Sequence, residues 1–406
     1  MTACAIESAA QDTAPEAFRT RAVSTAFTIT ANGSYGARLA GAGEALFPER
    51  WALRGSAPHA VPLPLAQPEE AGTDLQPLAN GQVLIRRPVG GRHLFSLLYP
   101  AGQGTGELPI GAVETPESPD LALLPPAPDG RRAYAIAPGE RASTIWLVAG
   151  GAFGPERVAV VPGHCSGGVW LDREGRVLAL DRRLDGGPRK AVAVDLGRAG
   201  EVTPLLQVAD GSEDRLLLAD VDSGLLLIRS NAPGRDRLGW GVWGSGLPVR
   251  FPTSLQPTDP AATVTPFALQ PGRLLTPERC AVALCIRAAD GGTHLGVWRP
   301  EGRRLHLRPG PEGWLAGAGW WDPNGVLGLP VSTPGMPCAI ARIGTASVFT
   351  DGRGAGDGPS GEVQDQDARG VVDAQRTVRL GGTGGPEGYR PIPLQQAPLG
   401  GRIGPG

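Results

Sequence analysis

Three adjacent side chains, His164, Cys165 and Ser166, form the one compact group in this chain that combines nucleophiles with a general base. A cysteine or serine activated by a histidine can attack a carbonyl carbon and form a covalent intermediate. Adjacent residues rarely point at one another, however, and the sequence assigns no partner acid to His164. We therefore favour the simpler interpretation, a turn between glycines with a buried thiol, and we assign no catalytic residue.

Basic side chains recur between apolar runs of the chain. The candidates for ligand binding among them are Arg92, His93, His164, Arg183, Arg189, Arg237 and His294, and Cys165 joins them from the group above. A guanidinium group offers two parallel donors to a carboxylate or a phosphate, so a ring of arginines at one end of the fold would suit an acidic ligand. The alternative is a solvated loop surface, partly neutralised by nearby acidic residues such as Glu69 and Glu213.

Tryptophans concentrate towards the end of the chain, at Trp240, Trp243, Trp298, Trp314, Trp320 and Trp321. Large aromatic residues between strands usually belong to a core. The adjacent pair Trp320 and Trp321 is the best candidate for an aromatic ligand wall, because neighbours on a strand face opposite ways. No metal-ligand spacing, phosphate-binding loop or dinucleotide fingerprint is present, so we predict no metal and no cofactor.

The elements that position these side chains follow from a repeat of about fifty residues. In its clearest copy, four short apolar runs (167–172, 176–183, 189–196 and 202–208) are separated by turn residues, which predicts four antiparallel strands. The turn between the first and second strands recurs seven times, as Asn32-Gly33, Asn80-Gly81, Asp129-Gly130, Glu174-Gly175, Ser223-Gly224, Glu278-Arg279 and Asn324-Gly325. We predict two-residue hairpin turns of the primed type, which need positive φ.

Seven four-stranded units at steps of 45 to 55 residues predict an all-β fold, a seven-bladed β-propeller. A large β-sandwich, or six or eight blades, is the alternative. No stretch of 12 or more residues within 25–350 has helical periodicity. The last unit lacks a fourth strand, so we expect the ring to close with a strand lent by Ala22–Thr30.

Three regions follow from this pattern. We predict a flexible N-terminal tail at 1–20, the propeller at 21–350, and a mostly disordered Gly/Pro-rich C-terminal tail at 351–406. The net charge of −2 gives no reason to expect nucleic acid or a membrane as a partner. Five scattered cysteines and the lack of an apolar N-terminal run predict a cytoplasmic protein. We also expect a monomer, with a protein or a small molecule as its partner.

The segments PDGRRAYAIA (128–137), DREGRVLALD (172–181) and DPNGVLGLPV (322–331) resemble the repeat of TolB-like propellers and of the propeller domain in prolyl oligopeptidase-type peptidases. This resemblance, over about 25–350, implies a fold rather than a function. In the peptidases it would imply a propeller beside an α/β-hydrolase domain with a serine triad. The chain has no G-x-S-x-G elbow, so we expect no serine-peptidase activity from this chain alone.

Two functions remain open at this stage. The first is a non-catalytic binding or scaffold propeller that presents its central funnel to a protein or a small acidic ligand. The second is a propeller-fold enzyme of bacterial specialised metabolism, a lyase, cyclase or hydrolase with isolated side chains in the funnel. A deep funnel pocket with convergent polar groups would favour the enzyme, and a shallow or plugged channel would favour the scaffold.

Overall fold

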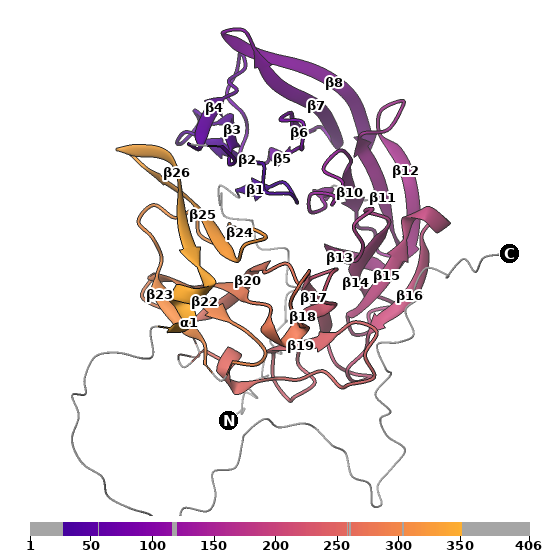
Figure 1. The fold of residues 1–406 in the computed structure, drawn as a ribbon. Helices are drawn as coiled ribbons and strands as arrows, with labels where there is room; N and C mark the ends of the chain where they lie inside the picture. Colours follow the sequence, from indigo (N-terminus) through magenta and orange to yellow (C-terminus); the bar gives the residue numbers. More distant parts are fainter. Residues whose placement is uncertain are drawn as a thin grey trace, which may run out of the picture.

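The computed structural model describes residues 27–350, apart from 56, 116–119, 258, 260 and 303. The predicted tails at 1–20 and 351–406 lie outside these residues. Within the described part the chain forms seven antiparallel sheets, and strands that are neighbours in a sheet are also neighbours in sequence. Figure 1 shows the sheets arranged as the blades of a ring, with the first strands β1, β5, β17 and β24 towards its centre. The fold is therefore the predicted seven-bladed β-propeller.

The strands of the first four blades have these bounds. Blade 1 contains β1 (Thr28–Ile29), β2 (Tyr35–Ala40), β3 (Phe47–Ala52) and β4 (His59–Pro62). Blade 2 contains β5 (Asp74–Pro77), β6 (Val83–Val89), β7 (Arg92–Ala101) and β8 (Gly104–Glu114). Blade 3 contains β9 (Ala122–Leu123), β10 (Ala133–Ala137), β11 (Ala142–Ala149) and β12 (Glu156–Pro162). Blade 4 contains β13 (His164–Trp170), β14 (Val177–Arg183), β15 (Lys190–Asp195) and β16 (Glu201–Leu206), in agreement with its four predicted runs.

The other three blades complete the ring. Blade 5 contains β17 (Asp214–Ala219), β18 (Leu225–Ser230) and β19 (Arg237–Val242). Blade 6 contains β20 (Thr263–Leu269), β21 (Val282–Arg287), β22 (Thr293–Trp298) and β23 (His306–Pro309). Blade 7 contains β24 (Trp320–Trp321), β25 (Val326–Thr333) and β26 (Met336–Gly344). The helices are short: η1 (Leu196–Arg198), η2 (Thr253–Leu255), η3 (Pro277–Arg279) and α1 (Thr345–Thr350). None of the helices within the described ranges is long and apolar enough to cross a bilayer.

The turns between first and second strands confirm the repeat but correct the predicted turn type. The six glycines of these turns all have positive φ, between 65° and 85°. The residues before them do not, so these are not primed two-residue turns, which need positive φ at Asn or Asp as well. Instead, the Asn80 side chain accepts a hydrogen bond from the Gln82 N–H at 3.0 Å. The side chains of Asn32 and Asp129 likewise accept from the backbone N–H two residues further along the chain. The seventh turn, without glycine, forms η3.

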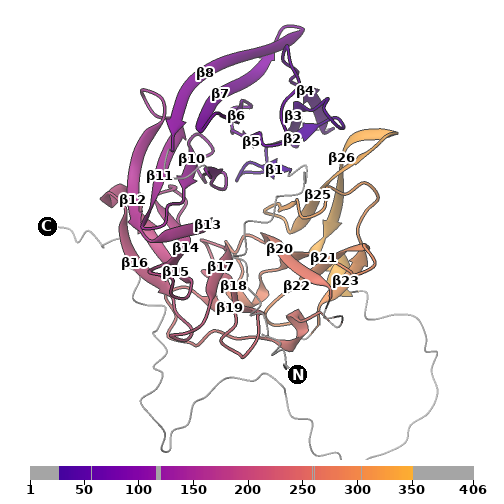
Figure 2. The same cartoon turned by 180° about the vertical axis from the view of Figure 1, so that it is seen from behind.

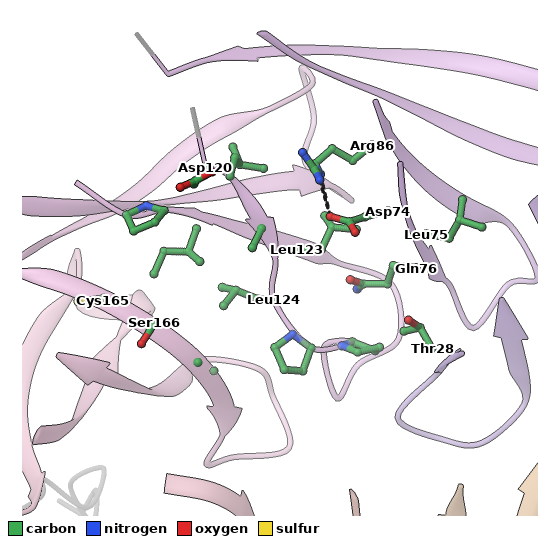
Figure 3. Close-up of a pocket in the computed structure, with 18 of the residues that line it drawn as sticks. Thr28, Asp74, Leu75, Gln76, Arg86, Asp120, Leu123, Leu124, Cys165 and Ser166 are labelled. Atoms are coloured by element: carbon green, nitrogen blue, oxygen red, sulfur yellow. Dashed lines mark hydrogen bonds and ion pairs between the residues drawn. The ribbon is translucent and has the colours of Figure 1, made fainter. Parts of the chain in front are cut away.

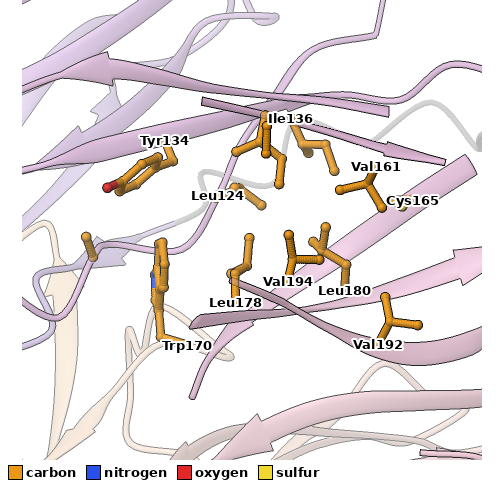
Figure 4. Close-up of a cluster of buried hydrophobic side chains, with 13 residues drawn as sticks. Leu124, Tyr134, Ile136, Val161, Cys165, Trp170, Leu178, Leu180, Val192 and Val194 are labelled. Carbon is orange, nitrogen blue, oxygen red and sulfur yellow. The ribbon is translucent and has the colours of Figure 1, made fainter. Parts of the chain in front are cut away.

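The second strand of a blade is buried on both faces, so its consecutive residues enter different seams between blades. In β18, Leu225 and Leu227 pack against blade 6, whereas Leu226 and Ile228 pack against blade 4. Figure 4 shows one such seam, where Ile136 of blade 3 faces Leu178 and Leu180 of blade 4. Six buried apolar clusters in the described part of the chain fill the six seams from blade 1/2 to blade 6/7.

The seam between blades 7 and 1 is different, and the views from both sides show β26 next to β4 there (Figures 1 and 2). None of the six apolar clusters spans it. The Arg38 guanidinium of blade 1 donates to Ser332 of blade 7 at 3.2 Å and forms an ion pair with Glu49 at 2.8 Å. The fully buried Trp51 donates its indole N–H to Glu49 at 2.7 Å. The Trp320 indole of blade 7 also packs against the Gly33 turn of blade 1, so one polar and one aromatic contact link the two blades here.

The prediction that Ala22–Thr30 lends a strand to blade 7 is wrong for the described part of that range. Thr28–Ile29 forms β1 and pairs with β2, inside blade 1. The reason is local: β1 is two residues long and leads directly into the Asn32-Gly33 turn and β2, so it cannot reach the outer edge of another blade. The remaining residues, 22–26, lie outside the described part.

Candidate functional site

A cavity of about 900 Å³ lies on the inner side of blades 1 to 5. Its wall comes from the first strands of these blades and from the segments that lead into them, at the end of the ring where second strands pass to third strands. This is the end at which the sequence predicts a ligand funnel. The wall combines an apolar run, Leu121–Pro126, with polar side chains. Figure 3 labels Asp74, Gln76, Arg86, Asp120 and Ser166 among these, and Asp181 and Arg215 also line the cavity.

One ion pair of the wall links β6 to β5. The Arg86 guanidinium, which is buried, donates to Asp74 Oδ2 from Nε at 2.9 Å and from Nη2 at 2.6 Å (Figure 3). Its Nη1 lies 3.0 Å from Nδ1 of the buried His93. Because arginine has no acceptor, His93 Nδ1 accepts this hydrogen bond. His93, which does not line the cavity, therefore helps to orient the Arg86 guanidinium.

A second ion pair of the wall joins blades 4 and 5. Arg215 Nε donates to Asp181 Oδ2 at 2.9 Å, and the Leu216 N–H donates to Oδ1 at 3.1 Å. Burial raises the pKa of Asp181, and the Arg215 hydrogen bond and charge oppose that rise. The guanidinium and the amide N–H on its two oxygens favour the charged form, against the effect of burial. Its role is then to fix β17 against β14.

Gln76 is the polar residue of the wall that its protein neighbours leave unsatisfied. It lies on β5 between Leu75 and Pro77, and only 2% of its surface is exposed. Its Nε2 has no hydrogen-bond partner among the described residues. In Figure 3 the amide points towards the cavity, facing Leu123 and Leu124. A buried amide without a partner is costly, and native structures rarely retain one without a water or ligand.

The β13 strand bulges where it lines the cavity. Its pairing with β14 shifts between Ser166 and Val169, and the two glycines in between have φ of 75° and 145°. A Cβ at Gly168 would lie 2.9 Å from a Leu124 methyl group, so a side chain there would push the Leu121–Pro126 run. Bulges of this kind are common beside binding sites because they redirect side chains. Here the bulge places Ser166 on the wall.

The predicted group His164, Cys165 and Ser166 is brought only partly to the cavity. Cys165 and Ser166 line it, and His164 does not. Burial raises the pKa of the Cys165 thiol to about 11. The Ser143 hydroxyl and the Arg182 charge lower this pKa, but their effect is smaller than that of burial. The thiol therefore stays protonated at neutral pH, where a nucleophilic cysteine would need its thiolate.

The predicted arginine ring is largely occupied by acidic partners. Arg92 forms an ion pair with Glu114 at 2.8 Å, and Arg183 and Arg189 lie 3.7 and 3.9 Å from Glu213. The side chain of Arg92 is 59% exposed. None of these three arginines lines the cavity. Acidic side chains thus lie beside all three of these arginines, outside the cavity wall.

The other predicted binding residues also lie away from the cavity wall. Arg237 begins β19 and His294 lies on β22, both half-buried. Trp321 is buried in the seam between blades 6 and 7, and Trp320 is on the opposite face of β24. Trp320 packs over Gly328 of its own blade and against the Gly33 turn of blade 1. The two indoles face opposite ways as predicted, but into two seams.

Sequence reasoning missed Asp74, Gln76, Asp181 and Arg215, and it left Arg86 out of the proposed site. A weak signal exists for Gln76, because it is the one amide within the apolar run Leu75–Leu78. Nothing in the sequence marks the two aspartates, since acidic residues also close turns throughout this chain. No group of three or more His, Cys, Asp or Glu that could hold a metal ion occurs in the described ranges.

Comparisons with known proteins give likeness at the level of the fold. No protein-family model matches the chain, and the search of curated proteins returns no match. Among solved structures, the puromycin-hydrolysing peptidase of Mycobacterium tuberculosis matches with a TM-score of 0.48 and 17% identity, over 82% of this chain and 53% of that one. Prolyl oligopeptidase B of Galerina marginata matches with a TM-score of 0.46 and 10% identity, over 76% and 45%.

TolB of Acinetobacter baumannii matches with a TM-score of 0.40 and 11% identity, over 75% of this chain and 78% of that one. The resemblance to TolB and to prolyl oligopeptidase propellers is thus found in structure as well as in sequence. The chain spans about half the length of the peptidases it matches. At these scores the comparisons carry no argument about activity, and the propeller assignment rests on the seven sheets.

Proposed function

We propose that the chain is a non-catalytic binding protein whose ligand is a small molecule held in the central cavity. The observation that carries this proposal is Gln76, a buried amide that is directed at a cavity of about 900 Å³ and has no partner for its Nε2 among the described residues. A ligand that accepts a hydrogen bond from this amide would remove the free-energy cost of burying it unsatisfied.

The size of the cavity supports a small molecule rather than a folded protein as the occupant. Pockets for drug-sized ligands have volumes of about 300 to 1,000 Å³ and are mostly apolar with a few placed polar groups. The wall fits this description, with the Leu121–Pro126 run on one side and two ion pairs and an amide around it. The ion pairs fix the shape of the wall in advance, which lowers the entropic cost of binding.

The competing hypothesis of a propeller-fold enzyme has one observation in its favour. Asp181 lies on the wall with a pKa raised by burial, as a general acid would require. Against it, both oxygens of Asp181 are held by Arg215 and the Leu216 N–H, which leaves no proton to donate. The Cys165 thiol is equally unsuited to attack a substrate, since burial keeps it protonated.

A capture experiment tests the proposal. The purified protein is incubated with a small-molecule extract of bacterial cells, washed and denatured, and the released compounds are measured by mass spectrometry. Ala122→Trp serves as the cavity-blocked variant, because Ala122 is an exposed residue of the wall. We expect at least one compound to be retained unchanged by the wild-type protein and lost with Ala122→Trp. Equal retention by both proteins would refute a ligand site in the cavity, and recovery of a converted compound would favour the enzyme.

A further inference from the structure

The charged side chains of the cavity wall are already engaged within the protein: two arginines pair with two aspartates, and a third carboxylate, Asp120, is not free either. Arg86 is paired with Asp74, and Arg215 with Asp181, while the one lysine of the chain, Lys190, pairs with Asp214 away from the wall. A carboxylate or phosphate entering the cavity would have to compete with an aspartate for each guanidinium. Burying a charged group without a free counter-charge costs its hydration free energy, and no new ion pair offsets that cost.

The apolar side of the cavity is rigid and continuous. Leu121 and Leu124 are buried in two neighbouring seams, which anchors the Leu121–Pro126 run at both ends. The carbonyl oxygen of Pro125 accepts a hydrogen bond from the Trp170 indole at 2.9 Å, and two prolines restrict the backbone further. Pro88 and Pro138 extend the apolar surface. This wall offers contact area to hydrocarbon and has few groups for a strongly hydrated ligand.

Gln76 supplies the directional contact. Its side chain carries a carbonyl and an NH₂ group with two donor hydrogens, and Nε2 donates neither of them to a described residue. The group that would satisfy Nε2 is an acceptor oxygen. A neutral carbonyl or ether oxygen does so without bringing a charge into the cavity.

From these three observations we infer that the cavity takes an uncharged, largely apolar molecule whose carbonyl-type oxygen accepts a hydrogen bond from Gln76 Nε2. The inference rests on the proposed function and narrows it to one ligand class. It replaces the acidic ligand that the arginine pattern suggests, because the arginines of the wall are already paired. Gln76 acts as the residue that selects the acceptor, and the Leu121–Pro126 run provides the apolar contact.

Three probes that share two cyclohexyl rings and differ in one central group test this inference: dicyclohexyl ketone, dicyclohexylacetate and dicyclohexylammonium. Their affinities are measured by saturation-transfer NMR titration on the full-length protein. We expect the ketone to bind most tightly. Gln76→Leu removes the donor and keeps the side-chain volume, so it should weaken ketone binding about tenfold, the equivalent of one hydrogen bond.

Gln256→Leu is the matched control. Gln256 also has a buried Nε2 without a partner among the described residues, but it lies after η2 and does not line the cavity. This variant should leave the ketone affinity unchanged, and Ala122→Trp should abolish it. Gln76→Leu should also raise the melting temperature of the ligand-free protein, because it removes an unsatisfied amide; this readout needs no ligand.

The outcomes separate the inference from the proposed function. Tighter binding of dicyclohexylacetate or dicyclohexylammonium, abolished by Ala122→Trp, would keep the cavity as a ligand site and overturn the ligand class. Ketone binding that survives Gln76→Leu would mean that a water satisfies the amide, and it would overturn the role of Gln76. If no probe binds while compounds are still captured from the cell extract, the inference alone fails.

Discussion

Two seams of the ring pack neighbouring blades together with different kinds of side chain. One lies between blades 5 and 6, and the other lies between blades 7 and 1. In the first, the fully buried Trp298 packs among Leu225, Leu227 and Leu284. In the second, Arg38 and Glu49 form an ion pair beside Trp51, and Ser332 accepts from Arg38 across the seam. Burial of apolar surface stabilises the first seam, whereas hydrogen bonds and an ion pair stabilise the second.

The difference has its origin in the alternation of residues along two strands. In β25, Leu327 and Leu329 enter the apolar cluster with blade 6, so Gly328 and Pro330 face the other way. In β2, Ala37 and Leu39 enter the cluster with blade 2, which leaves Arg38 for the last seam. Both strands that meet across the last seam thus direct their leucines away from it. We therefore expect the seam between blades 7 and 1 to contribute the least apolar burial to the closed ring.

The largest expected effect tests the apolar seam. Trp298→Ala should lower the free energy of unfolding by about 3 to 5 kcal/mol, because it opens a cavity and frees the Ser254 hydroxyl that Trp298 Nε1 contacts at 3.0 Å. Trp320→Ala is the matched change at the polar seam, where the indole is half-buried, and should cost about 1 to 2 kcal/mol. Urea denaturation measures both. Equal losses would remove the distinction between the seams.

A smaller effect is expected at the polar seam itself. Arg38→Met should lower the free energy of unfolding by about 1 to 3 kcal/mol, because Glu49, which is 7% exposed, loses its guanidinium partner. Adding Glu49→Gln removes the stranded charge and retains an acceptor for Trp51, so the double variant should regain part of the loss. A double variant no more stable than Arg38→Met would show that the ion pair does not act as a pair.

The smallest expected effect is a difference in the rate of alkylation between two thiols, Cys165 and Cys338. Burial raises the pKa of Cys165 to about 11, and burial together with Glu49 raises that of Cys338 to about 11 as well. Below pH 9, each thiolate is then about 100-fold scarcer than at the ordinary pKa of 9.0. We expect slow alkylation of both by iodoacetamide, about tenfold faster for each pH unit up to the pKa.

The order of modification separates the two seams. Cys165 is fully buried in the seam between blades 3 and 4, whereas Cys338 is half-buried near the last seam. Cys338 should therefore react first in a Cys4→Ser background, as followed by peptide mass spectrometry. Because Cys165 also lines the cavity, its reaction at the rate of Cys338 would mean that the reagent reaches it through the cavity or through an opened seam, and it would contradict the expected order.

The repeat could be predicted from sequence because its signal is local. The glycine at each of six turns is needed for a positive φ, and the seventh turn, with Arg279 in that place, forms a 3₁₀ helix instead. The four runs of blade 4 became its four strands for the same reason, since alternation and turn residues act over a few positions. The turn type was missed because it depends on backbone angles that Asn80 and Asp129 can adopt in either form.

The candidate site could not be predicted in this way, because it depends on which blades face one another. Asp181 and Arg215 are 34 positions apart and meet only across a seam. Gln76 is recognisable as an exception on an apolar strand, but the sequence does not say whether its amide meets a protein group or a cavity. His93 was singled out for its own chemistry, and its observed role is to orient Arg86.

All the residues that line the cavity lie between positions 28 and 217, in the first five blades. A molecule bound there would touch five consecutive sheets at once and would leave blades 6 and 7 to their own contacts. Occupancy should therefore shield the first half of the chain from proteolysis more than the second. Blade 1 belongs to both regions, since Leu39 lines the cavity and the adjacent Arg38 contacts Ser332 across the last seam, so a change in one region can reach the other through β2.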